Sequence, residues 1–158
     1  MHYELIFASD QDRIVINNLM QFYMYDFSEY LGFDVEEDGL FKEYPNLGDF
    51  WTETGDKVAY IVKKGEKYVG FVLVKTMDSQ RNHFSIAEFF IMKKYRREGI
   101  GKAVAQELFS LYEGQWEVHQ RENNKPAQKF WRKIIDEYTK GQFSERFENG
   151  RMIQNFKS

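Results

Sequence analysis

The stretch of sequence that decides the fold is Arg96-Arg97-Glu98-Gly99-Ile100-Gly101-Lys102. It lies between residues 84–92, which are typical of a β-strand, and residues 103–112, which are typical of an α-helix. A glycine-bearing turn that opens a helix gathers unpaired N–H groups and the positive end of the helix dipole. Glycine lets the main chain approach a ligand closely, and three basic side chains add positive charge. The stretch therefore predicts a binding site for an anionic, phosphate-bearing ligand.

Two common phosphate-binding motifs do not fit this stretch. A Walker loop needs glycine five residues before Gly101, where Arg96 stands, and Ser or Thr after Lys102, where Ala103 stands. A dinucleotide fingerprint needs a third glycine at the position of Val104. Neither a nucleoside triphosphate nor a dinucleotide is the expected ligand.

The pattern that remains is Arg/Gln-x-x-Gly-x-Gly/Ala, which resembles the coenzyme A pyrophosphate signature of the GCN5-related N-acetyltransferase (GNAT) superfamily. Residues 88–96 are similar to the fourth strand of that family, which ends in an aliphatic residue, here Ile91, five positions before the motif arginine. Residues 124–131 look like its Asn-x-x-Ala-x-x-Phe-Tyr segment. Two motifs at the expected separation make the resemblance specific from about Ser85 to Trp131.

The order of expected elements agrees with this family. Hydrophobic periodicity and turn residues predict a strand, a helix, an irregular segment, three strands, a helix, a strand, a helix and two strands. The expected ranges are 3–7, 9–32, 33–54, 58–63, 68–75, 84–92, 100–113, 116–119, 125–138, 143–148 and 151–156. The resemblance implies one α+β domain over residues 1–158, with three layers. Its mixed, mostly antiparallel sheet is splayed between strands 4 and 5, is flanked by helices and holds the acyl-thioester arm in the gap.

The resemblance also implies acetyl-CoA as co-substrate. We expect main-chain N–H groups from Arg97 to Lys102 to bind the pyrophosphate, and main-chain groups near Ile91 and Met92 to pair with the pantetheine arm. A plain helix cap with solvated charges is the alternative at residues 96–102, and a plain cap formed by Asn123 or Asn124 is the alternative on the next helix. The expected cofactor residues are Ile91, Met92, Arg96, Arg97, Glu98, Gly99, Ile100, Gly101, Lys102, Asn124, Ala127 and Trp131.

Glu88 is the expected catalytic base, because many family members place a carboxylate three residues before the end of this strand. Direct transfer of acetyl to an amine needs proton removal but no covalent enzyme intermediate, so the absence of cysteine is no obstacle. Strand alternation predicts Ile86, Glu88, Phe90 and Met92 on one face, where apolar neighbours would raise the pKa of Glu88. The alternative is a structural glutamate paired with a lysine or arginine.

Trp131 departs from the family, which often has tyrosine there as the acid for the leaving thiolate. An indole N–H is no proton source near neutral pH, so Tyr95, Tyr138, water or unassisted departure would have to substitute. This departure motivates a second hypothesis, a non-catalytic acyl-CoA-binding sensor or interaction module. His83 and His119 are expected to be surface or cap residues.

The acceptor is expected to be a cationic amine, either a small molecule or a peptide. The segment from residue 26 to residue 56 is strongly acidic and contains one basic residue. Asp26, Glu29 and Tyr30 would share a helix face that attracts such a substrate; the alternative is a solvated face that only aids solubility. The acidic residues are Asp26, Glu29, Asp34, Glu36, Glu37, Asp38, Glu43, Asp49, Glu53 and Asp56.

Composition narrows the other expectations. A net charge of −3 disfavours a nucleic-acid partner, and the spacing of His, Asp and Glu suggests no metal site. No apolar run reaches the roughly 18 residues that span a membrane, and no signal peptide is evident at the N-terminus. The chain is therefore expected to be soluble and cytoplasmic, with a C-terminal hairpin whose edge would suit a homodimer.

Overall fold

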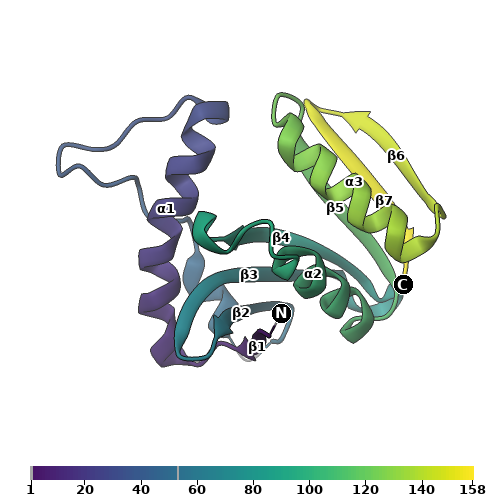
Figure 1. Cartoon of the computed structure of the whole chain (residues 1–158), viewed down its shortest axis with the longest axis horizontal. Helices are drawn as coiled ribbons and strands as arrows, with labels where there is room; N and C mark the ends of the chain where they lie inside the picture. The colour runs from purple at the N-terminus through teal and green to yellow at the C-terminus, as the bar shows by residue number, and fades with distance from the viewer. Residues whose placement is uncertain (1, 53) are drawn as a thin grey trace.

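The computed structural model describes residues 2–52 and 54–158. Its elements are β1 (Glu4–Phe7), η1 (Asp10–Asp12), α1 (Arg13–Leu31), η2 (Leu47–Trp51), β2 (Lys57–Lys64), β3 (Lys67–Asp78), η3 (Ser79–Arg81), β4 (His83–Ile91), η4 (Lys93–Tyr95), α2 (Ile100–Leu111), β5 (Gln115–Arg121), α3 (Lys125–Thr139), β6 (Phe143–Glu148) and β7 (Arg151–Lys157), where η marks a short 3-10 helix. Figure 1 labels the α-helices and β-strands along the chain. No helix in the described ranges is both long and apolar enough to cross a membrane.

The seven strands form one sheet in the order β1-β2-β3-β4-β5-β7-β6. All neighbouring pairs are antiparallel except β4 and β5, which are parallel. The parallel pairing covers only residues 83–85 of β4 and 115–117 of β5, although β4 continues to Ile91 and β5 to Arg121. Beyond the paired residues the two strands separate, as Figure 1 shows. The predicted splayed, mostly antiparallel sheet is confirmed.

The sheet has an apolar core on each face, so the protein has three layers. On β3, Phe71 and Leu73 pack against α1, whereas Val72 and Val74 pack under α2, because successive side chains of a strand point to opposite faces. We call the first cluster the α1-side core; α1 contributes Ile16, Leu19, Met20 and Tyr23 to it. We call the second cluster the α2–α3 core; these helices contribute Ile100, Val104, Ala105, Leu108, Phe109, Trp131, Ile134 and Ile135 to it.

Local sequence explains where several elements begin and end. Gly32 ends α1 in the left-handed conformation with φ of 73°, as expected from the sequence. The Asn124 side chain accepts a hydrogen bond from the Ala127 N–H and caps α3. Asn149 and Gly150 have φ of 52° and 74°, which suits the two-residue turn between β6 and β7. These features follow from residues close together in the chain, so they could be predicted.

The prediction that Ile86 shares a face with Glu88 is wrong. In the register of β3 and β4, Leu73 lies opposite Glu88 and Val74 lies opposite Ile86, which leaves Ala87 as an extra residue in β4. This β-bulge shifts the alternation by one residue, so Ile86 joins the α2–α3 core while Glu88 faces α1. A strict two-residue period cannot anticipate an inserted residue.

Candidate active site

The turn before α2 presents a row of unpaired main-chain donors. None of the residues that the structure describes accepts a hydrogen bond from the N–H groups of residues 97–102. Arg97 and Gly99 both have left-handed backbone conformations, with φ of 68° and 84°. Turns that contain such residues can direct successive N–H groups into one concave anion site. The expected pyrophosphate-binding residues therefore have the free donors that this function needs.

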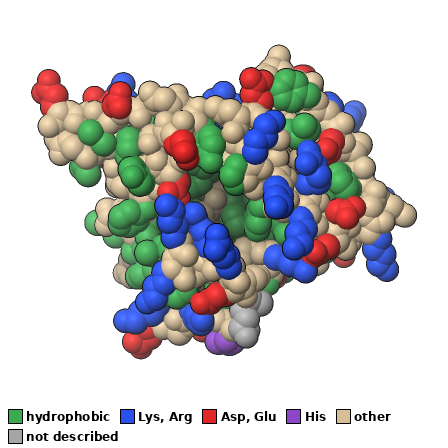
Figure 2. Space-filling model, turned by 45° about the horizontal axis from the view of Figure 1, so that its top comes forward, with side chains coloured by type: hydrophobic (Ala, Val, Ile, Leu, Met, Phe, Trp, Pro, Cys, Tyr) green, Lys and Arg blue, Asp and Glu red, His purple; other side chains and the backbone are tan. Residues whose placement is uncertain are grey.

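The charges near this turn are more compensated than the sequence suggests. Arg96 pairs with Asp26 at 2.7 Å, and Lys102 pairs with Glu137. Arg97, in contrast, has no acidic partner within 4.0 Å among the residues described. Figure 2 shows lysine and arginine side chains gathered around a hollow that has a partly hydrophobic floor. Anion binding at this turn would rest on main-chain donors, with Arg97 as the available cation.

Gly101 lies where helix α2 approaches its neighbours closely. A Cβ atom added there would meet the Phe130 ring at 3.2 Å and the Ile91 side chain at 3.7 Å. A small residue at this position lets the start of α2 lie against both β4 and α3. Packing alone therefore favours glycine at this position, apart from the expected role of Gly101 in cofactor binding.

The end of β4 is only partly available to a cofactor arm. The Met92 N–H donates to the Val69 carbonyl at 2.8 Å, and the Ile91 carbonyl accepts from Arg96 Nε at 2.7 Å. Because main-chain groups alternate in direction along a strand, the Ile91 N–H points away from β3, toward the gap. Pairing with a pantetheine arm thus remains open to Ile91, whereas the N–H of Met92 already has a partner within the sheet.

Aromatic side chains line the α3 wall of the splayed region. Phe89 packs on Trp131 with ring centroids 5.0 Å apart, and Phe130 packs on Trp131 at 5.2 Å. Trp131 is 7% exposed and belongs to the α2–α3 core. Its role here is packing, and it offers no acid. Tyr138 lies about two helical turns further along α3, where its hydroxyl is 3.1 Å from that of Ser110.

Glu88 lies on β4 with two tyrosine hydroxyls directed at its carboxylate. Tyr23 of α1 donates to Oε2, and Tyr44, from the segment between α1 and η2, donates to Oε1 at 3.2 Å. Among the described residues, no lysine or arginine forms an ion pair with it. The structure therefore does not show the alternative role for Glu88, which was a structural glutamate paired with a lysine or arginine.

The surroundings of Glu88 favour the protonated form more than water would. Burial raises the pKa of Glu88 above its usual value, although the Tyr23 and Tyr44 hydrogen bonds and the charges of Lys75 and Arg151 act in the opposite direction. A carboxylate with a raised pKa is a stronger base and suits general base catalysis near neutral pH.

The three expected substrate-binding residues have different surroundings. Asp26 pairs with Arg96 at 2.7 Å and lies 4.0 Å from Lys93, so it connects α1 to the turn before α2. The Tyr30 carbonyl accepts from Asn123 Nδ2 at 2.9 Å, which connects the end of α1 to the segment before α3. Glu29 is exposed. Glu53, another member of the acidic segment, lies outside the described residues.

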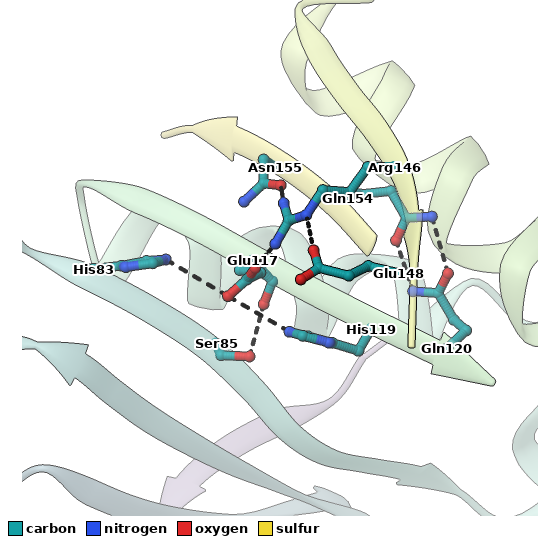
Figure 3. A network of polar contacts seen from close by, with 9 residues as sticks. All are labelled: His83, Ser85, Glu117, His119, Gln120, Arg146, Glu148, Gln154 and Asn155. Atoms are coloured by element: carbon teal, nitrogen blue, oxygen red, sulfur yellow. Dashed lines mark hydrogen bonds and ion pairs between the residues drawn. The ribbon is translucent and has the colours of Figure 1, made fainter. Parts of the chain in front are cut away.

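Sequence reasoning missed a cluster of charged and polar residues where β4 and β5 separate, which we call the Glu117 cluster (Figure 3). It comprises Glu117, His83, His119 and Arg146. Arg146 Nη2 lies 2.6 Å from Glu117 Oε1, while His119 Nε2 and His83 Nε2 lie 3.5 Å and 3.9 Å from Oε2. The alternation of Glu117 and His119 on β5 was the only signal in the sequence, because the other two residues come from β4 and β6.

Burial and charge act differently on the two titratable members of β5. Burial by itself would raise the pKa of Glu117, but the Arg146 hydrogen bond and the nearby histidines bring it below its usual value. Burial lowers the pKa of His119, although Glu117 opposes this effect. His119 Nδ1 is buried without a hydrogen-bond partner in the described structure. These shifts favour a neutral His119 imidazole beside an ionised Glu117 carboxylate.

Several solved structures share this fold. An acetyltransferase from Thermus thermophilus aligns with a TM-score of 0.76 at 12% identity, covering 100% of this chain and 98% of that chain. PaiA N-acetyltransferase from Thermoplasma acidophilum, in complex with coenzyme A, aligns with a TM-score of 0.67 at 14% identity, covering 100% of both chains. Spermidine N-acetyltransferase from Vibrio cholerae, in complex with CoA and spermine, aligns with a TM-score of 0.68 at 13% identity. The alignment covers 98% of this chain and 95% of that chain.

Sequence comparison decides the family. Comparison with curated protein sequences gives no match. The family model for the acetyltransferase (GNAT) family matches residues 17–135, which is more than half of the chain and includes both motifs and Glu88. With the splayed sheet and the free N–H groups before α2 already established, this match shows that the chain belongs to the GNAT family of acetyltransferases.

Proposed function

We propose that the protein transfers an acetyl group directly from acetyl-CoA to an amine, with Glu88 as the base. The observation that carries this proposal is the placement of Glu88. It lies on β4 with a raised pKa and has two hydroxyl donors. The same strand leads into the turn whose main-chain N–H groups are free.

The reaction needs few groups from the protein. A proton passes from the amine to Glu88, the amine nitrogen forms a bond to the acetyl carbonyl carbon, and the carbon–sulfur bond breaks to release the CoA thiolate. The N–H groups of residues 97–102 and Arg97 would hold the pyrophosphate, while Ile91, Asn124 and Ala127 would border the pantetheine arm. We propose that the thiolate leaves without a dedicated acid, since Trp131 cannot supply a proton.

The acceptor we propose is a cationic amine. Glu29 is an exposed residue of α1, and the exposed carboxylates of residues 34–43 belong to the segment that Gln21 attaches to α1. Glu88 also faces α1. The Vibrio cholerae neighbour of the same fold was solved with spermine, a polycationic amine. Asp26 contributes less to this attraction, because Arg96 and Lys93 compensate its charge.

The experiment that tests this proposal is thiol release from acetyl-CoA across a panel of amines. We expect wild-type turnover with at least one cationic amine, and Glu88→Gln should lower turnover by roughly 10² or more while cofactor affinity stays close to that of wild type. Tight acetyl-CoA binding without turnover on any amine would instead favour a non-catalytic acyl-CoA-binding module, the function suggested by Trp131.

A further inference from the structure

The two oxygens of the Glu88 carboxylate are not equivalent. Both accept hydrogen bonds from tyrosine hydroxyls, since an ionised carboxylate can only accept. Oε2 accepts from Tyr23, whereas Oε1 accepts from Tyr44 at 3.2 Å. The two donors come from parts of the chain with very different packing.

Tyr23 is held firmly. It is 7% exposed, and its ring packs edge-on against Phe27 at 4.6 Å, Phe71 at 5.7 Å and Phe90 at 5.8 Å. These contacts come from α1, β3 and β4, so the hydroxyl cannot leave Oε2 unless the α1-side core moves.

Tyr44 is held more loosely. It is half-buried, and no aromatic ring within the described ranges stacks on it at a distance comparable to those around Tyr23. Its ring packs against the α1-side core from the segment between α1 and η2, and hydrogen bonds between Gln21 and the Phe41 main chain attach this segment to α1. Tyr44 also borders an open cavity of about 710 Å³ that Asn17, Glu43 and Leu47 help to line. Its side chain therefore has space into which it can turn.

We propose that Tyr23 is a positioning residue that anchors Oε2 of Glu88, and that Tyr44 is a gate on Oε1 which the acceptor amine displaces when it binds. This inference rests on the proposed function of the same site. The amine nitrogen then lies against Oε1 and transfers its proton to that oxygen, while Tyr23 keeps the carboxylate in the correct orientation.

The gate has a consequence for the pH dependence of the reaction. Tyr23 of α1 and Tyr44 of the following segment contact Glu88 directly, while Lys75 of β3 and Arg151 of β7 act on it only through their charges. Loss of either hydroxyl removes a donor that stabilises the ionised carboxylate, so each loss raises the pKa of Glu88 in the free enzyme. In the complex with amine, however, Tyr44 has already left Oε1. Its removal should then change nothing further.

The test compares Tyr23→Phe with Tyr44→Phe, two variants that keep the ring and lose only the hydroxyl. The acidic limb of the kcat/KM profile reports the free enzyme, and that of kcat reports the complex. For Tyr23→Phe we expect both limbs to move to higher pH, by about one pH unit. For Tyr44→Phe we expect only the kcat/KM limb to move, with a kcat profile that superimposes on that of wild type. Tyr25→Phe, an exposed tyrosine of α1, is the matched control.

A second measurement does not need turnover. The side-chain carboxyl carbon of Glu88, assigned by its loss in Glu88→Gln, is titrated by carbon-13 NMR in the free protein. Both tyrosine variants should raise its midpoint, and Tyr25→Phe should not. An equal shift of the kcat limb in both variants would overturn the gate, and an unmoved NMR midpoint in Tyr23→Phe would overturn the anchor. If the variants show raised midpoints but the wild-type protein acetylates no amine, the anchor is supported and the proposed function is refuted.

Discussion

At the scale of single residues, the motif glycine is where ligand binding and packing can be separated. Gly101→Asp places bulk and negative charge at the pyrophosphate site, so we expect acetyl-CoA binding to be lost while the fold is retained. Gly101→Ala is the control, because its methyl group only has to displace the Phe130 ring by a few tenths of an ångström. Removal of Arg97 should weaken binding only modestly. Calorimetric titration measures all three variants, and unchanged affinity in Gly101→Asp would contradict the cofactor assignment.

Asp26 and Glu29 are three residues apart but are expected to act on different ligands. Asp26→Asn removes the ion pair that holds Arg96 and the turn before α2 against α1. The less ordered turn should bind acetyl-CoA more weakly, and this effect should exceed any rise in the KM of the amine. Glu29→Gln should raise the KM of a dicationic amine, and the defect should shrink as salt rises because exposed charges are screened. Steady-state kinetics at two ionic strengths, together with calorimetry, separates the two effects. A raised amine KM in Asp26→Asn with unchanged cofactor affinity would restore Asp26 to the substrate site.

At the scale of elements, the Glu117 cluster couples β4, β5 and β6 through groups whose charge depends on pH. The pKa of His119 is lowered in the fold, mainly by burial, so the unfolded chain binds the proton more readily. The contribution of a neutral His119 to stability is therefore present above its unfolded pKa of about 6.5 and is lost as pH falls below that value.

We expect the free energy of unfolding of wild type to decrease as pH falls below about 6.5, and to change less steeply in His119→Gln. The exposed His2 provides the control variant, His2→Gln. Urea denaturation at several pH values measures the slope. A wild-type slope that survives in His119→Gln would assign the effect to other groups.

At the scale of the whole molecule, the buried Glu88 carboxylate should lower stability. The folded pKa of Glu88 is raised, so its ionised form disfavours folding above that pKa, and this effect disappears as pH falls toward the unfolded value. Glu88→Gln should therefore melt at a higher temperature than wild type at pH 7.5, and the difference should shrink near pH 4. Each kcal/mol gained corresponds to about 2–4 °C for a chain of this size. Differential scanning calorimetry at both pH values checks this, and a lower melting temperature for the variant at pH 7.5 would mark Glu88 as structural.

The sequence by itself determined the features that depend on neighbouring residues. The turn at residues 96–102, the end of α1 at Gly32, the cap at Asn124 and the turn at Asn149-Gly150 all follow from local backbone preferences. The two motifs carried the resemblance to the family, and that resemblance implied the splayed sheet. The expected helix and strand boundaries are less exact: β3 continues to Asp78, three residues past its expected end, and α1 begins at Arg13, after the short helix η1.

Only the tertiary structure decided which side chains meet. Tyr23 and Glu88 are 65 residues apart, and Asp26 and Arg96 are 70 apart, so no local rule could pair them. The bulge at Ala87 turned Ile86 to the other face, and the parallel register of β4 and β5 brought His83 to Glu117. Contacts of this kind depend on sheet register and on helix placement, which the packing of the two cores sets for the molecule as a whole.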